Sequence, residues 1–491
     1  MNASIRSSLV AFLVAGFVVA PMALWAATTC STDCAQTSCT VDCNETDVRD
    51  AVAKANGCAG DGDWTARSIT IATPGCTVSL VNDAAAAAAV PNSSCAGDTE
   101  EFAVCITNDN VRFLGEGAIF EYGGDAFCGQ CGSECPPPQP GLFTLKGNSN
   151  TIENLTFRYF PEGIQIREGD NHQVIDVTSD RICEDAISVQ SGVGHIIRGA
   201  TLVGNQLPDA GRVCGLSNGT DGACGTDKAV QINDGSATVI DCRFETISQP
   251  VALVRGEHWV TDNVVIGSVS DHNICQSFTV SSVARVTFRG NTMDHCKFGI
   301  RVDGNALAIA ENNTITNPWV SAFNLRSFGK LKAEGNRIKT RAGGFTDVSD
   351  APRGILVARS SASSRADLGG GDLEERSVVD DALCASGGDC SVGGNKFCSA
   401  GVGTQTDIWN ITDCPCLDQL CAGALGRCTP YVCAPLDEEG RCAGSGGGGA
   451  SIGARTNCFA GPGALVDLKD TAPAHTATSG ATVCGPTDCD F

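Results

Sequence analysis

Short hydrophobic runs, most of them interrupted by a polar residue, recur through the middle of the chain. They occupy residues 163–166, 186–189, 229–232, 252–254, 277–280, 299–302 and 322–325, and their starting positions differ by 23, 43, 23, 25, 22 and 23 residues. The 43-residue spacing contains an insertion at 204–226 with two cysteines, Cys214 and Cys224. Alternation of this kind predicts strands that bury one face.

A second strand precedes several of these runs, at 151–157, 173–177, 238–244 and 285–288, and Asn and Gly residues lie between the strands. A repeat of about 22–25 residues with two or three short strands and Asn/Gly corners is typical of one coil of a parallel β-helix. A leucine-rich repeat has a similar period, but its Leu-x-x-Leu-x-Leu pattern is absent. We therefore predict an all-β, right-handed parallel β-helix.

The two ends of the chain suggest how the solenoid is closed. Residues 46–56 predict a short amphipathic helix, opened by Thr46 or Asp47, that caps the first coil before a strand at 68–71. Segments 366–370 and 393–397 resemble late coils, whereas the Cys- and Gly-rich stretch 414–450 predicts an insertion or a disulfide-bonded cap. The expected division is a signal peptide at 1–26, cap and first coils at 27–145, the β-helix core with the active site at 146–345, and late coils with the Cys/Gly-rich region at 346–491.

Composition narrows the class of protein. Hydrophobic residues make up 42% of the chain and aromatic residues 5%, so the core is built mainly from aliphatic side chains. The net charge of −23 argues against a nucleic-acid partner, because phosphate binding requires a basic surface. An anionic substrate would need local cations or a bridging metal.

The N-terminus and the cysteines indicate an exported protein. Arg6, the apolar run 9–20 and small residues around Ala26 form the pattern of a secretory signal peptide cleaved near Ala26. No other long apolar run exists, so we expect a secreted monomer without a membrane span. All 29 cysteines follow this segment, which favours disulfides. Zinc binding is the alternative at Cys128, Cys131 and Cys135 and at Cys414 and Cys416, and the odd count leaves at least one thiol free or paired between chains.

A charged strip is the candidate for chemistry. Glu162, Glu184 and Asp185 come just before or within two successive repeats, Lys228 begins the next, and Arg255 follows the one after. If these residues occupy equivalent positions, they lie on one side of the solenoid, about 4.8 Å apart from coil to coil. The simpler interpretation is that the acids cap turns and that Lys228 forms a solvated ion pair.

The runs 183–188 (CEDAIS) and 226–244 (TDKAVQINDGSATVIDCRF), followed by Arg255, resemble the secreted pectate lyases of polysaccharide lyase family three over residues 160–260. The resemblance implies that Glu162, Glu184 and Asp185 bind Ca²⁺ and that Lys228 and Arg255 act on the sugar. Gln190 stands where that family commonly has a further Lys.

The implied reaction is β-elimination of polygalacturonate, an acidic polysaccharide. Calcium and cationic side chains would stabilise charge that develops on the uronate carboxylate. Arg255 is the candidate base and Lys228 assists, or the roles are reversed. Arg301 and Arg326 occupy comparable points in later coils and compete with Arg255 for this role.

Two other functions stay open. The first is a non-catalytic, secreted or cell-surface β-helix that binds carbohydrate. The second is a glycoside hydrolase of the polygalacturonase type, which requires paired acids; its Gly-His-Gly motif is absent, since the nearest match is Gly194-His195-Ile196. The six histidines show no paired spacing and are expected to be surface or core residues, and the surroundings of Cys296 indicate packing alone.

Overall fold

The structure, a computed structural model, describes most of the chain between residues 30 and 339. The described residues are 30, 33–58, 67–80, 102–122, 141–160, 162–180, 182, 185–204, 228–269, 275–327 and 329–339, with the backbone of short strands between 353 and 483. The predicted signal peptide at 1–26, residues 205–226 of the insertion predicted at 204–226, and the Cys/Gly-rich stretch at 414–450 lie outside these residues. No helix in the described part is both long and apolar enough to cross a bilayer.

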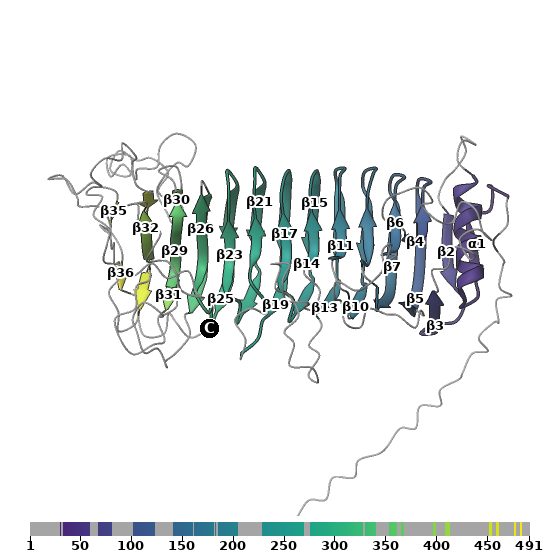
Figure 1. The fold of residues 1–491 in the computed structure, drawn as a ribbon, viewed down its shortest axis with the longest axis horizontal. Coiled ribbons are helices and arrows are strands. Elements are labelled where there is room, and N and C mark those ends of the chain that lie inside the picture. Colours follow the sequence, from purple (N-terminus) through teal and green to yellow (C-terminus); the bar gives the residue numbers. More distant parts are fainter. Residues whose placement is uncertain are drawn as a thin grey trace, which may run out of the picture.

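The chain forms a parallel β-helix, as the repeat predicts (Figure 1). All strand pairs are parallel, and each strand pairs with its equivalent in the next coil, as in β11 with β14 and β14 with β17. The strands form two sheets, of 25 and 11 strands, here called sheet A and sheet B. Sheet A consists of two ladders that share β5 and β7, because these two strands continue through the corner that separates the ladders in later coils.

The strands belong to three ladders, two in sheet A and one in sheet B. The first ladder of sheet A contains β1 (Ser38–Val41), β2 (Arg67–Ile71), β5 (Val111–Tyr122), β7 (Thr151–Arg158), β9 (Gln173–Ile175), β12 (His195–Arg198), β15 (Ser236–Ile240), β18 (Glu257–Thr261), β21 (Arg285–Arg289), β24 (Leu307–Glu311), β27 (Lys330–Glu334), β30 (Arg365–Asp367), β33 (Ser451–Gly453) and β35 (Thr476–Ala477). The second adds β3 (Thr77–Leu80), β10 (Thr178–Asp180), β13 (Thr201–Val203), β16 (Arg243–Glu245), β19 (Val264–Ile266), β22 (Thr292–Asp294), β25 (Thr314–Thr316), β28 (Arg337–Lys339), β31 (Lys396–Cys398), β34 (Cys458–Ala460) and β36 (Thr482–Val483). Sheet B contains β4 (Phe102–Ile106), β6 (Gly141–Leu145), β8 (Ile164–Ile166), β11 (Asp185–Val189), β14 (Lys228–Ile232), β17 (Gln249–Leu253), β20 (Phe278–Val280), β23 (Phe298–Val302), β26 (Ser321–Ser327), β29 (Arg353–Ser360) and β32 (Ile408–Thr412).

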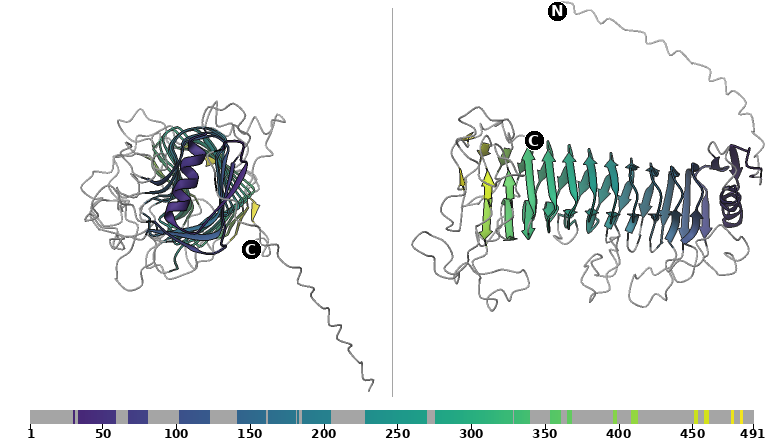
Figure 2. Two further views of the ribbon diagram at one scale, coloured as in Figure 1. Left: turned by 90° about the vertical axis from the view of Figure 1, so that its right-hand side faces the viewer. Right: turned by 90° about the horizontal axis from the view of Figure 1, so that it is seen from above.

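The helix α1 (Glu45–Asn56) lies across the open end of the first coils (Figures 1 and 2). It begins slightly before the predicted start, because Asn44 is the N-cap and its Oδ1 accepts the backbone N–H of Asp47 at 2.9 Å. Val48 and Val52 are fully buried against the first strands. The helix therefore covers the apolar end of the solenoid, as predicted.

Alternate side chains of every ladder fill a single narrow core. In sheet B, Ile187 and Val189 are fully buried and stack on Val230 and Ile232 of the next coil. The corner between the two ladders of sheet A is held by Asn263, Asn291, Asn313 and Asn336, which are buried and joined in sequence by side-chain hydrogen bonds of 2.9 Å. The Asn residues of the repeat thus satisfy backbone groups inside the corner.

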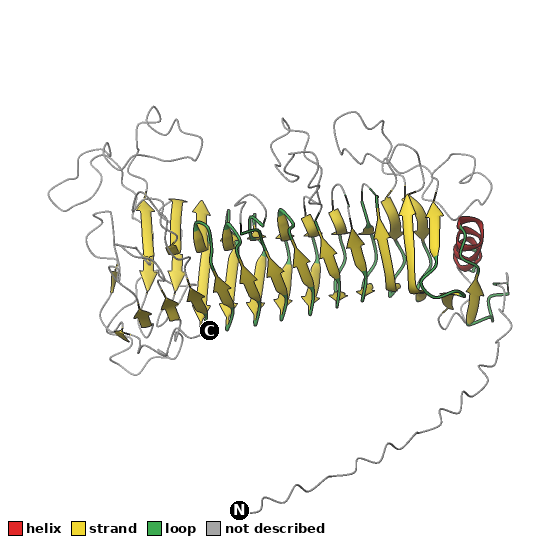
Figure 3. Ribbon diagram, turned by 90° about the horizontal axis from the view of Figure 1, so that it is seen from below, coloured by secondary structure: helices red, strands yellow, loops and turns green. Residues whose placement is uncertain are grey.

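Disulfides connect neighbouring segments, as the cysteine content predicts. The described pairs are Cys30–Cys39, Cys34–Cys58, Cys43–Cys76 and Cys275–Cys296. Cys242 is a buried free thiol, and burial raises its pKa to about 12. The segments at 366–370 and 393–397 overlap β30 and β31, which pair with β27 and β28. Figure 3 shows the strands of successive coils lying side by side along the solenoid, with α1 at one end.

Candidate functional site

Four residues at the start of successive sheet B strands form one column, here called the strand-start column: Glu162, Asp185, Lys228 and Gln249. Asp185 is in register with Lys228, and Lys228 with Gln249. The pairing of Ile164 with Ile187 places Glu162 beside Asp185. The predicted alignment of acids with Lys228 on neighbouring coils is therefore present in the backbone register.

Asp185 and Lys228 contact each other directly. The Nζ of Lys228 lies 3.5 Å from Oδ1 of Asp185, and their side chains are 25% and 11% exposed, respectively. A partly buried pair of this kind is less screened by solvent than a surface pair. It holds a partly exposed ammonium group at the edge of sheet B where the strands start.

Arg255 does not belong to this column. The repeat suggested a spacing of 23 residues between Ala229 and Ala252, but Lys228 pairs with Gln249, so this coil is 21 residues long. Arg255 therefore comes six residues after the partner of Lys228, about 20 Å along the strand direction. It is exposed and precedes Gly256, whose φ of +96° belongs to the corner at the far edge of sheet B. Lys228 and Arg255 thus lie at opposite edges of the sheet.

The structure describes two of the three predicted calcium ligands. Carboxylate oxygens are suitable ligands for Ca²⁺, and Glu162 and Asp185 adjoin in the strand-start column. Glu184 lies outside the described residues. Among the residues that are described, no group of three His, Cys, Asp or Glu side chains converges as a metal site. The ammonium of Lys228 occupies one side of Asp185, so the two described carboxylates do not form a complete calcium site by themselves.

The outer face of sheet B also carries a network of neutral amides. Gln190 Nε2 donates to Ser188 Oγ at 2.7 Å, and Asn233 Nδ2 donates to Gln190 Oε1 at 2.7 Å. Gln231 Nε2 continues the network by donating to Asn233 Oδ1 at 2.6 Å. These side chains alternate with the core residues Val189 and Ile232 and so point outward. Gln190, which replaces the lysine expected from the resemblance, is the centre of this network.

Farther along the same face, two arginines share one carboxylate. Arg301 Nε lies 2.6 Å from Asp303 Oδ2, and Arg326 Nε lies 3.6 Å from Asp303 Oδ1. All three side chains are between 20% and 33% exposed. The cluster therefore presents a net positive charge at strands β23 and β26.

The charge of this face is opposite in sign to that of the whole chain. At the outward positions in β6 to β26 and directly after these strands, which alternate with the buried core residues, the described residues include four cations and one carboxylate: Lys146, Arg167, Arg301, Arg326 and Asp303. The chain as a whole carries −23. The sequence analysis singled out Lys228 and noted the two later arginines, but it missed the amide network. The Gln-x-Asn spacing of Gln231 and Asn233 was the available signal.

Comparison with known proteins supports the fold. Residues 228–367 match the family model described as the right-handed beta helix region, in agreement with the predicted handedness. Among curated proteins, none matches the sequence.

Several solved structures are similar at low identity. An alginate lyase from Paenibacillus sp. str. FPU-7 is 12% identical with a TM-score of 0.43, and the similarity covers 66% of this chain and 99% of that one. The tailspike protein of E. coli bacteriophage HK620, in a complex with a pentasaccharide, is 10% identical with a TM-score of 0.43, over 81% of this chain and 60% of that one. A polygalacturonase from Erwinia carotovora ssp. carotovora is 11% identical with a TM-score of 0.29, over 69% and 95%. These similarities describe the fold and do not identify a substrate.

Proposed function

We propose that this protein binds an acidic polysaccharide along the outer face of sheet B. The observation that carries the proposal is the charge of that face, whose outward positions carry four cations and one carboxylate on a chain of net charge −23. An acidic polymer is repelled by the chain as a whole, so it would bind where the cations are concentrated.

The neutral part of the face suits the rest of a sugar. The amides of Gln190, Gln231 and Asn233 provide donors and acceptors that match hydroxyl groups. Equivalent positions repeat along the solenoid at about 4.8 Å, so an extended chain would meet similar groups on successive coils. Cations at Lys228 and at Arg301 with Arg326 would then bind carboxylates of the polymer.

Binding of soluble polyuronates, measured by affinity electrophoresis and calorimetry, tests the proposal. Polygalacturonate and alginate are compared with an uncharged dextran, each at low and high salt. We expect the polyuronates to bind and the affinity to fall as salt rises. The double variant Arg301→Ala/Arg326→Ala should weaken binding about 10-fold, as expected for about 1.4 kcal/mol.

A matched control uses two lysines on another face. Lys330 and Lys332 point outward from β27 in sheet A, so Lys330→Ala/Lys332→Ala removes the same charge without altering sheet B. Its affinity should stay within about 2-fold of the wild type. Equal binding of dextran and polyuronate, or equal losses in the two double variants, would contradict the proposal.

A second candidate, calcium-dependent pectate lyase activity, is favoured by the strand-start column. Glu162 and Asp185 adjoin, and Lys228 contacts Asp185, as the resemblance to polysaccharide lyase family three implies. Glu162, Glu184 and Asp185 would hold Ca²⁺, which would supply positive charge near the uronate carboxylate. With Arg255 at the opposite edge of the sheet, Lys228 is the candidate base.

Absorbance of unsaturated product from polygalacturonate tests this second candidate. Wild-type protein is assayed with calcium and with a chelator, beside Lys228→Ala and Lys332→Ala. Calcium-dependent product that is lost in Lys228→Ala supports the lyase. Absence of product despite binding of the polymer leaves the binding proposal and excludes pectate lyase activity.

A further inference from the structure

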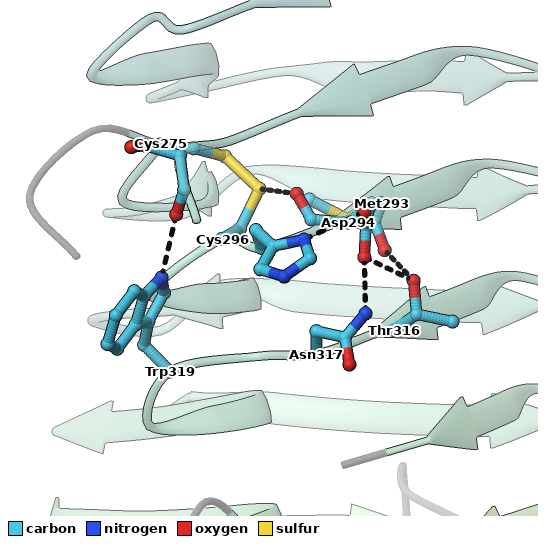
Figure 4. Close-up of polar contacts among 9 residues, drawn as sticks. Cys275, Met293, Asp294, Cys296, Thr316, Asn317 and Trp319 are labelled. Carbon is cyan, nitrogen blue, oxygen red and sulfur yellow. Dashed lines mark hydrogen bonds and ion pairs between the residues drawn. A yellow bond between two sulfur atoms is a disulfide. The ribbon is translucent and has the colours of Figure 1, made fainter. Parts of the chain in front are cut away.

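A carboxylate–imidazole pair lies at the corner that leads from β22 into β23. Asp294 ends β22 and His295 follows it, while Thr316 and Asn317 come from the next coil (Figure 4). None of these residues belongs to the strand-start column or to the amide network. Because His295 and Asp294 are adjacent in sequence, the conformation of this corner alone brings their side chains together.

The Asp294 carboxylate is held by three side chains. Its Oδ2 lies 2.8 Å from His295 Nδ1, and its Oδ1 accepts hydrogen bonds from Thr316 Oγ1 at 2.7 Å and Asn317 Nδ2 at 2.8 Å. Partial burial alone would raise the pKa of Asp294, but these hydrogen bonds outweigh it and lower the pKa. The carboxylate is therefore ionised near neutral pH.

An ionised Asp294 determines which nitrogen of His295 can accept a proton. A carboxylate only accepts hydrogen bonds, so Nδ1 carries the hydrogen in the pair. Nε2 of neutral His295 then has a lone pair. Among the residues that the structure describes, none forms a hydrogen bond with this nitrogen, and the side chain is 21% exposed. The imidazole is thus oriented as a proton acceptor on a partly exposed side chain.

The backbone around the pair is braced. The disulfide Cys275–Cys296 joins the residue after His295 to the preceding coil, and Trp319 Nε1 donates to Ser268 O at 3.1 Å (Figure 4). The positive φ of His295, +55°, is shared by Tyr159, Thr246 and Asn317 at the same corner of other coils, so it belongs to the fold. The hydrogen bonds of Asp294, and not the backbone angle, distinguish this coil.

The neighbouring groups suit a uronic sugar. The half-buried indole of Trp319 offers a flat apolar surface for a sugar ring. Lys297 lies two residues after His295, with its Nζ 5.9 Å from the Phe298 ring centroid, and Arg301 follows on the outer face of β23. Cations and an oriented base thus occur on one coil.

We propose that His295, positioned by Asp294, is the proton acceptor for β-elimination of a polyuronate bound to this protein. The inference rests on the proposed binding of an acidic polysaccharide. Nε2 takes the proton from the carbon next to the uronate carboxylate, and the electron pair of that C–H bond forms the new C=C bond. The C–O bond to the neighbouring sugar breaks, and the departing oxygen takes up a proton from the imidazolium, directly or through water. No metal or redox partner is consumed in this step.

This position differs from the candidate base Lys228. Strands β17 and β20 separate β14, which Lys228 begins, from β23, which follows His295. Three coil spacings amount to about 14 Å. The two residues would therefore act on different sugars of a bound chain, and substitutions separate them.

Binding and product formation, measured on the same samples, test the inference. Wild type, His295→Gln, Asp294→Asn and the control Lys332→Ala are incubated with polygalacturonate and with alginate, and unsaturated ends are followed by absorbance. His295→Gln retains a donor toward Asp294 but has no basic nitrogen, so it should form product about 10²–10⁴-fold more slowly than wild type. Asp294→Asn should also slow the reaction, and Lys332→Ala should not. Polymer affinity should change less than about 2-fold in all variants.

A pH profile distinguishes a base from a structural role. The wild-type rate should fall on the acid side of its pH profile, and the residual rate of His295→Gln should lack that acid limb. Wild-type protein that binds polyuronate without forming unsaturated ends, or His295→Gln at the wild-type rate, overturns the inference and leaves the binding proposal intact. Failure of wild type to bind any polyuronate overturns the proposed function, and this inference with it.

Discussion

The imidazole rings of His172 and His195 stack in parallel inside neighbouring coils, with centroids 5.4 Å apart and planes inclined by 11°. Each Nδ1 accepts a backbone N–H, that of Asn150 for His172 and that of His172 for His195, at 3.2 and 3.3 Å. Each Nε2 lies near a carbonyl oxygen, that of Glu168 or Ser191. Both rings must be neutral to make this set of contacts, because a protonated Nδ1 cannot accept.

This stack predicts that the protein loses stability in mild acid. Burial, and for His195 also the charge of His172, lowers the pKa of both rings, that of His195 from 6.5 to about 4. Between these two values the unfolded chain binds more protons than the folded chain. The contribution of His195 is therefore complete above pH 6.5 and decreases as the pH falls toward 4, by on the order of 2 to 3 kcal/mol. Urea unfolding at a series of pH values measures it.

The variant His195→Asn provides the comparison, because other carboxyl groups also titrate in acid. Asn150 occupies the equivalent position one coil before His172, and its Oδ1 accepts the backbone N–H of Val111, so Asn can serve at this corner. We expect the difference in unfolding free energy between wild type and His195→Asn to decrease from pH 7 to pH 4. A difference that does not vary with pH would show that the stack does not titrate on unfolding.

The Asn ladder predicts a large local cost for a small substitution. Asn291 donates to Val260 O at 2.8 Å and accepts from the backbone and side chain of Asn263. Asn291→Ala leaves these buried groups without their partner and should lower the free energy of unfolding by about 3 kcal/mol. Thr292→Ala, one residue away and exposed, should change it by less than about 0.5 kcal/mol. Similar values for the two variants would mean that the ladder does not stabilise the fold.

The fold followed from the sequence because its repeat is directly visible. Alternation at 186–189 and 229–232 identified strands that bury Ile187 and Val230 on the same side. Asn291 and Asn313 marked a corner, although their mutual hydrogen bonds depend on the stacking of coils and cannot be read from one coil. The start of α1 was misplaced because Asn44, and not Thr46 or Asp47, supplies the capping oxygen.

The site was less predictable, because it depends on register across coils of unequal length. Asp185 and Lys228 were placed together correctly, since both immediately precede the same small, buried Ala position. Arg255 was misplaced because the coil from β14 to β17 is shorter than its neighbours. His295 was overlooked because its significance comes from Thr316 and Asn317 on the next coil, which orient Asp294.

The separation of Lys228 from Arg255 predicts unequal effects on binding. Lys228→Ala removes a cation from the strand-start edge of sheet B and should weaken polyuronate binding about 5-fold, equivalent to about 1 kcal/mol. Arg255→Ala acts at the opposite edge and should change the affinity by less than about 2-fold. Titration of both variants with polygalacturonate at low salt provides the measurement. A larger loss in Arg255→Ala than in Lys228→Ala would move the binding surface to that edge.

The disulfide Cys275–Cys296 predicts a stability effect that is coupled to the corner of His295. It closes a loop of 21 residues, for which chain entropy gives about 3 kcal/mol. The double variant Cys275→Ser/Cys296→Ser should lower the free energy of unfolding by about that amount, measured in urea at neutral pH. Cys242→Ala removes a buried sulfur without breaking a cross-link and should cost about 1 kcal/mol.

Because the disulfide anchors the residue after His295, the double variant should also slow any reaction that uses this histidine, whereas Cys242→Ala should not. Equal stability of the double variant and the wild type would show that hydrogen bonding between coils alone holds this corner.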